Sequence, residues 1–131
     1  MTGLDTNVLV RYIMQDDVAQ AAVATALLES LTAESPGYVT QVVMVELFWV
    51  LTSAYRLTRG QAAQALELLL QSRELRFERG DELKVALRTY KQSSADFPDC
   101  LIAQVASAEG CVRVMTFDRN AAKVAGMELL G

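Results

Sequence analysis

The chain has 131 residues, 52% of them hydrophobic, with 16 acidic and 12 basic side chains and no histidine. This length suits one hydrophobic core, so we predict a single domain over residues 1–131. The absence of histidine excludes Ser-His-Asp and Cys-His catalysis. The net charge of −4 argues against a broadly basic surface for nucleic acid.

Neither a membrane span nor a secretory signal is predicted. No stretch reaches the roughly 18 uninterrupted apolar residues of a membrane-spanning helix. Asp5 stands where a signal peptide carries a basic residue. Cys100 and Cys111 are the only cysteines, too few for a disulfide framework. We therefore expect a cytoplasmic protein that does not enter a membrane.

The first third of the chain predicts a strand followed by two helices. A very short apolar lead precedes Asp5, and Asp-Thr-Asn at residues 5–7 are helix-capping types. We expect a strand that ends near Asp5 and a helix directly after it. A second helix is expected within residues 15–33, where Asp16 and Asp17 favour the first turn.

The middle of the chain predicts a second strand and two more helices. Pro36-Gly37 marks a turn before a short strand over Tyr38–Thr40. Thr40 suits the cap of the next helix. Thr58 and Gln61 match the Thr-x-x-Gln capping box of the helix after that.

The remaining elements continue the alternation of strands and helices. We predict, in chain order, a strand at 75–78, helices within 80–94 and 96–110, a strand at 111–117, a helix at 118–126 and a last short strand at 127–131. Short strands separated by helices indicate an α/β fold in which helices cover both faces of a parallel sheet.

The stretch VVMVELFWVL, residues 42–51, holds nine apolar residues and one carboxylate, Glu46. No basic residue lies within one or two helical turns of Glu46, and an unpaired carboxylate in an apolar interior is costly. Two interpretations remain open. Glu46 points outward from a half-exposed helix, or it faces a cleft whose cation comes from outside the chain.

Three more carboxylates stand at element boundaries. Asp5, Asp99 and Asp118 lie where strands pass into helices or where helices begin, and each alone is a typical helix cap. In open parallel sheets, ligand sites form beyond the carboxyl ends of strands. Together with Glu46, in a chain without histidine, these acids favour a site for a hard cation such as Mg²⁺ or Mn²⁺.

Four motifs resemble those of the PIN-domain family, in order and with similar spacing: LDTNVL, VEL, DFPDCLIA and TFD. The likeness runs from residue 4 to about residue 118, and it is greatest to the small PIN ribonucleases that serve as toxins in VapBC toxin–antitoxin pairs. This resemblance implies a PIN-like three-layer α/β/α fold, with a central, mostly parallel sheet of about five short strands.

The resemblance also implies roles for individual residues. Four acids would form the catalytic quartet that holds Mg²⁺ or Mn²⁺: Asp5, Glu46, Asp99 and Asp118. Asp5 and Asp99 are the expected direct ligands. Four further residues would support the site: Thr6, Asn7, Asp96 and Thr116.

The implied function is metal-dependent endonucleolytic cleavage of RNA, by the toxin of a type II toxin–antitoxin pair. The expected partners are the RNA substrate, a cognate antitoxin and a second copy of the chain. The sequence adds an independent hint, because the helices within residues 42–72 carry more large apolar side chains than one core-facing stripe requires. At least one of Leu68, Leu69 and Leu70 should therefore face away from the core.

Two alternatives to this function remain. A receiver-like or dehalogenase-like phosphotransfer domain also places Asp after its first strand, but it calls for a Lys at a late strand end, which VMTFDRN does not offer. It also does not call for Glu46. A PIN-like binding module without catalytic activity is the second alternative, although all four acids are present.

Overall fold

The computed structural model describes all 131 residues, Met1–Gly131. The chain divides into two compact units, Met1–Glu78 (unit 1) and Arg79–Gly131 (unit 2). The helices and strands follow the predicted order, β-α-α-β-α-α-β-α-α-β-α-β. The assignment of residues 1–131 to a single domain stays a prediction. None of the helices combines the length and apolar character that crossing a membrane requires.

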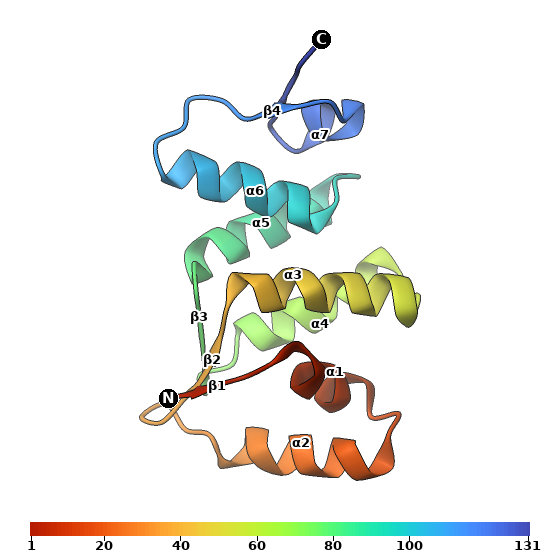
Figure 1. Cartoon of the computed structure of the whole chain (residues 1–131), viewed down its shortest axis with the longest axis vertical. Coiled ribbons are helices and arrows are strands. Elements are labelled where there is room, and N and C mark those ends of the chain that lie inside the picture. Colours follow the sequence, from red (N-terminus) through yellow and green to blue (C-terminus); the bar gives the residue numbers. More distant parts are fainter. The chain divides into compact units, whose positions relative to one another are not determined.

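Unit 1 contains three short strands, four α-helices and one π-helical turn (Figure 1). In chain order they are β1 (Thr2–Gly3), α1 (Thr6–Met14), α2 (Val18–Ser30), β2 (Gly37–Val39), α3 (Gln41–Trp49), η1 (Val50–Ala54), α4 (Arg59–Leu70) and β3 (Leu75–Phe77).

The sheet of unit 1 has β2 at its centre, paired in parallel with β1 on one side and β3 on the other. Gly37 in β2 is required by close packing. A Cβ atom at this position would lie 2.9 Å from side-chain carbons of Leu4, Leu31 and Leu75. Three leucines thus meet over a residue with no side chain, which explains the glycine in an otherwise unfavourable strand position.

Helix starts in unit 1 confirm the capping predictions. The Thr40 hydroxyl accepts a hydrogen bond from the Val43 amide at 3.2 Å, which caps α3. Thr58 and Gln61 form both hydrogen bonds of the capping box of α4. These caps satisfy amides that the first helical turn leaves without an intrahelical partner.

The end of α3 was not predicted, because it runs on into the π-helical turn η1. The Tyr55 amide donates to the Val50 carbonyl at 3.2 Å, and Arg56 follows with a left-handed φ of 55°. The Tyr55 hydroxyl then donates to Asp16 at 2.7 Å, and Arg11 donates to the Tyr55 oxygen at 3.1 Å. These bonds tie the end of α3 to the connection between α1 and α2.

The core of unit 1 lies between its helices. α1 packs against α2 and α3, and α3 also packs against α4. The large side chains that are almost completely buried are Leu9, Val10, Met44, Leu47 and Leu66 from these helices and Leu51 from η1. Removal of this apolar surface from water is the main favourable contribution to folding of the unit.

Unit 2 is built on two packed helices and a parallel pair of short strands (Figure 1). Its elements are α5 (Gly80–Gln92), α6 (Phe97–Ala108), β4 (Met115–Thr116), α7 (Arg119–Val124) and β5 (Glu128–Leu129). α5 and α6 bury Leu83, and they bring Tyr90 and Phe97 edge to face with ring centroids 6.3 Å apart. Aromatic rings prefer this arrangement to direct stacking.

The predicted fold class is confirmed, since the protein is an α/β protein with short parallel strands. Three of the five strands pair within unit 1 and two within unit 2. The strand predicted over residues 111–117 is shorter than expected and covers only Met115–Thr116. Val112 is 98% exposed. The residues before Met115 therefore lack the side-chain burial that stabilises a strand.

Candidate functional site

Asp5 follows the carboxyl end of β1 and begins α1. The Leu4 amide donates to the Tyr38 carbonyl at 3.0 Å, so the chain remains paired with β2 up to this point. The Asp5 carboxylate accepts a hydrogen bond from the Thr6 amide at 2.7 Å. Asp5 is exposed, and it therefore caps the helix while its side chain remains accessible to a ligand from solvent.

Glu46 lies on an exposed face of α3, in agreement with the first of the two interpretations, in which it points outward from a half-exposed helix. The helix buries Val43, Met44, Leu47 and Phe48. The opposite face presents Val42, Glu46 and Trp49, spaced four and three residues apart as one helical stripe. The Glu46 side chain accepts a hydrogen bond from the Thr6 hydroxyl at 2.9 Å. Unit 1 thus brings Asp5, Thr6 and Glu46 together.

Asp118 and Thr116 form a second acidic position, in unit 2. Asp118 Oδ1 accepts hydrogen bonds from the amides of Asn120 at 2.8 Å and Ala121 at 3.0 Å, and so caps α7. The Thr116 hydroxyl accepts the Asp118 amide at 3.0 Å. One oxygen of Asp118, Oδ2, makes no hydrogen bond and stays open to a ligand.

Asp99 lies in the first turn of α6, which begins after its N-cap residue Asp96. Partial burial raises the pKa of the Asp99 carboxyl above its usual value, and the negative charges of Asp118 and Asp96 raise this pKa further. Neither Asp96 nor Asp99 makes a side-chain hydrogen bond within α6 or elsewhere. Unit 2 therefore holds three carboxylates near enough to repel one another, and a cation would relieve that repulsion.

A polar contact that the sequence did not predict holds α7 close to the start of α6. The Asn120 side chain donates to the Ser94 carbonyl at 3.2 Å, and the Ser94 hydroxyl donates to Asn120 Oδ1 at 3.4 Å. Ser94 precedes Asp96 by two residues and Asn120 follows Asp118 by two. This link positions the acids of unit 2, and no local pattern connects residues 26 positions apart.

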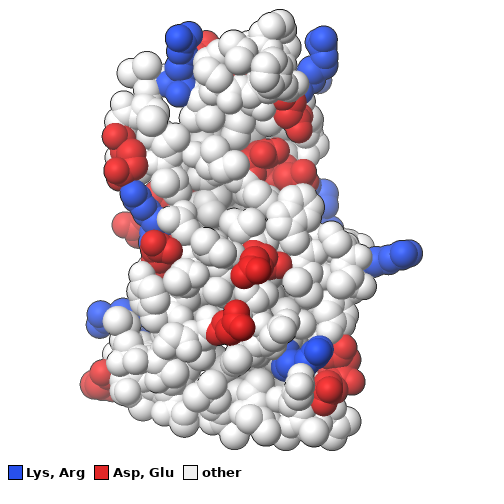
Figure 2. Space-filling model, in the orientation of Figure 1, with Lys and Arg blue, Asp and Glu red and all other residues white.

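None of the four predicted ligands forms an ion pair. Arg11 pairs with Asp16, and Arg79 pairs with Glu82 and Glu109. In neither unit do lysine and arginine side chains gather into a continuous patch on the face drawn in Figure 2. No group of three or more His, Cys, Asp or Glu side chains in either unit is arranged to hold a metal ion. Asp5 and Glu46 lie in unit 1, and Asp99 and Asp118 lie in unit 2.

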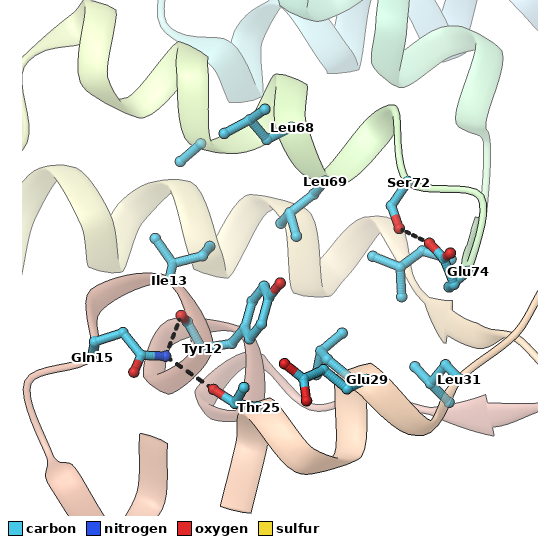
Figure 3. Close-up of a pocket in the computed structure, with 13 residues that line it drawn as sticks. Tyr12, Ile13, Gln15, Thr25, Glu29, Leu31, Leu68, Leu69, Ser72 and Glu74 are labelled. Atoms are coloured by element: carbon cyan, nitrogen blue, oxygen red, sulfur yellow. Dashed lines mark hydrogen bonds between the residues drawn. The ribbon is translucent and has the colours of Figure 1, made fainter. Parts of the chain in front are cut away.

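Two pockets of unit 1 lie mostly apart from these acids. The larger, of about 820 Å³, is lined by α1, α2, α4 and β3, and it contains none of the eight predicted site residues. Figure 3 shows Tyr12 and Leu69 on its walls, with Glu29 and Glu74 among the polar groups. The smaller, of about 420 Å³ between α1 and α2, includes the predicted supporting residue Asn7.

The comparison with protein families gives one match over nearly the whole chain. The family model described as PIN domain matches residues 4–127, which includes all eight predicted site residues and elements of both units. No curated protein matches the chain.

Proposed function

Because the chain belongs to the PIN-domain family, which is generally a family of nucleases, we propose that it is a Mg²⁺- or Mn²⁺-dependent endoribonuclease. The observation that carries this proposal is the family match over residues 4–127, combined with acids at the four motif positions Asp5, Glu46, Asp99 and Asp118. Membership of this family also sets aside the receiver-like and dehalogenase-like alternatives.

The donor set fits a hard divalent cation. All four acids offer carboxylate oxygens, which Mg²⁺ and Mn²⁺ prefer, and none of them is neutralised by an arginine or lysine. Burial raises the pKa of Asp99, and the negative charges of Asp118 and Asp96 add to this effect. PIN domains generally use divalent metal ions, and we propose that Asp5 and Asp99 are direct ligands, with Glu46 and Asp118 completing the site.

Bound Mg²⁺ or Mn²⁺ supplies positive charge that stabilises the phosphodiester as its negative charge grows during hydrolysis. The protein's own contribution is to hold the acids in place. Thr6 and Thr116 orient Glu46 and the Asp118 segment, and the caps of α1 and α7 fix Asp5 and Asp118. In the absence of histidine, a carboxylate of this set is the available acceptor for the proton of the attacking water.

We further propose that the protein is a cytoplasmic toxin that forms a homodimer and binds a cognate antitoxin. The support beyond the resemblance is apolar surface. Leu68 is 62% exposed and borders the larger pocket, and Val42 and Trp49 are 63% and 47% exposed. The prediction that one of Leu68–Leu70 faces away from the core is confirmed. Exposed apolar groups beside a pocket are typical of surfaces that a protein partner covers.

The test of the nuclease function uses the purified full chain and a generic single-stranded RNA. We expect cleavage in the presence of Mn²⁺ or Mg²⁺, no cleavage with excess chelator, and no cleavage by Asp118→Asn. Asn keeps the capping capacity of this position, so the variant stays folded. A folded wild-type chain that binds RNA but never cleaves it with either metal would favour the inactive binding module instead.

A further inference from the structure

We propose that Thr6 is a positioning residue that fixes the Glu46 carboxylate for cation binding, an inference that rests on the proposed nuclease function. Thr6 is 7% exposed and is the one buried residue of the chain whose side chain is charged or carries an amide or aliphatic hydroxyl. Its hydroxyl donates to Glu46 Oε1 at 2.9 Å, across 40 residues of sequence. The contact joins the start of α1 to the second turn of α3.

The Thr6 hydroxyl is not needed to form its own helix. Asp5 already caps α1 through the Thr6 amide. Two other helical threonines, Thr52 and Thr89, bond to the carbonyl four residues back, at 2.8 Å and 3.3 Å. Thr6 is the first residue of α1, so no helical carbonyl lies four residues before it. Its hydroxyl is therefore available to a side chain on another helix, and it donates to Glu46.

The group that donates a hydrogen bond to Glu46 is a neutral hydroxyl, so the carboxylate keeps its full negative charge. Asp16, another carboxylate of unit 1 that bonds across elements, is held by the Arg11 guanidinium and the Tyr55 hydroxyl. Glu46 has only the Thr6 hydroxyl. Its Oε2 atom makes no hydrogen bond, and no basic side chain pairs with it. Thr6 therefore restrains the carboxylate without neutralising it, which leaves Glu46 able to bind a cation.

The restraint is effective because Thr6 itself is rigid. It is buried and β-branched, so its χ1 rotamer is restricted, whereas the longer Glu46 side chain has three rotatable bonds to immobilise. The Thr6 amide also donates to Asp5 Oδ1 at 2.7 Å. One residue thus bonds to both acids that unit 1 contributes. Partners of this kind, which orient metal ligands, typically change metal affinity or activity by about 10–100-fold when removed.

The experiment compares Thr6→Val, which keeps the side-chain shape and removes the hydroxyl, with Thr6→Ser, which keeps the hydroxyl. Thr52→Val is the matched control, because it makes the same chemical change at a hydroxyl that donates to the Phe48 carbonyl and makes no hydrogen bond to Glu46. Mn²⁺ affinity is measured by titration calorimetry and RNA cleavage by initial rates, on full-length protein. We expect Thr6→Val to bind Mn²⁺ at least roughly ten-fold more weakly, while Thr6→Ser and Thr52→Val keep wild-type affinity.

A second comparison separates positioning from a general structural role. In a Glu46→Gln background, Thr6→Val should cause no further loss of Mn²⁺ affinity, because residues that act through one contact are not additive. If Thr6→Val does not fold, Thr6→Ala and Thr6→Ser take its place, and affinity should be lost with Ala and retained with Ser. Circular dichroism and the melting temperature show which variants are folded.

The outcomes distinguish the two proposals. A wild-type chain that binds Mn²⁺ and cleaves RNA, with a folded Thr6→Val that does both equally well, overturns the positioning role alone. Equal losses in the wild-type and Glu46→Gln backgrounds also overturn it. A folded wild-type chain that neither binds Mn²⁺ nor cleaves RNA overturns the proposed function, and the role of Thr6 in it.

Discussion

The two units hold their acids in different ways. In unit 1, Asp5 and Glu46 are both bonded to Thr6, through its amide and its hydroxyl. In unit 2, Asp118 is bonded to amides, but Asp99 has no hydrogen bond, and its pKa is raised by burial and by neighbouring acids. Unit 1 has nine acidic and five basic side chains, whereas unit 2 has seven of each.

This difference indicates separate roles for the two sets of acids. The acids of unit 1 are fixed by neutral donors before any ligand arrives, so they are preorganised. The acids of unit 2 repel one another locally although their unit has no net charge. Because unit 2 has equal numbers of acidic and basic side chains, this repulsion arises from the positions of the acids relative to one another. Added positive charge would relieve it.

The largest expected effect comes from truncating the core of either unit. Leu47→Ala in unit 1 and Phe97→Ala in unit 2 remove side chains that are completely buried. Each should lower the free energy of unfolding by about 2–5 kcal/mol, measured by denaturant titration. If residues 1–131 act as one domain, each variant shifts a single transition to lower denaturant. Two transitions, of which each variant shifts only one, would contradict the single-domain prediction.

A matched pair of glycines tests the packing that places Asp5 at the end of β1. Gly37→Ala should destabilise the protein by about 1–3 kcal/mol, because the new methyl group overpacks the three leucines around it. Gly60→Ala in α4 meets nothing within 4 Å and should stabilise by up to about 1 kcal/mol. Thermal unfolding of both variants should show opposite signs, and a Gly37→Ala variant as stable as wild type would refute the tight packing.

Replacing one acid in each unit tests the difference in preorganisation. Without metal, Asp99→Asn should raise the melting temperature at neutral pH, whereas Asp5→Asn should change it little because Asn also caps helices. The pKa of Asp99 in the folded protein is raised above the ordinary value of 3.8. Ionised Asp99 therefore lowers the stability of the folded protein at neutral pH. The gain from Asp99→Asn should therefore vanish as the pH falls below 3.8. Equal melting temperatures of Asp99→Asn and wild type at neutral pH would count against local repulsion.

The smallest expected effect concerns the structural carboxylate Asp16 of unit 1. The hydrogen bond from Tyr55 lowers the pKa of Asp16, and the same bond raises the pKa of Tyr55. Tyr55→Phe should therefore lower the melting temperature slightly near neutral pH. This difference should fade as the pH falls through the lowered pKa of Asp16, because the protonated acid no longer favours the bond. Tyr12→Phe, whose hydroxyl makes no hydrogen bond, is the control and should match wild type throughout.

Much of the fold was predictable because its signals are local. Thr40 and the Thr58–Gln61 capping box each predict that a helix begins at the next residue. Local capping patterns of this kind were sufficient to predict the order of the elements. The π-helical turn at Val50–Ala54 was not predicted, because hydrophobic periodicity does not distinguish a single π-helical turn from an α-helix. The apolar run around Glu46 left open whether one face of α3 is exposed, and the structure shows that it is.

The candidate site could be proposed from the sequence as a set of residues, but its geometry could not be predicted. Asp5, Asp99 and Asp118 are candidates because each stands at or near a helix start, and Glu46 is a candidate because it is a lone charge in an apolar run. Their bonding partners could not be identified. The contact of Thr6 with Glu46 and that of Ser94 with Asn120 join residues 40 and 26 positions apart. Helical or strand periodicity carries no information over such separations.

The central proposal is that Mn²⁺ binding requires both Asp5 and Asp99, and a Mn²⁺ titration of four proteins tests it most directly. These are the wild type, Asp5→Asn, Asp99→Asn and the double variant, each confirmed as folded. If the acids act together, each single variant loses most of the Mn²⁺ affinity and the double variant loses little more, because the sites are coupled. Independent, additive losses from the two variants, or wild-type affinity in either one, would contradict the claim.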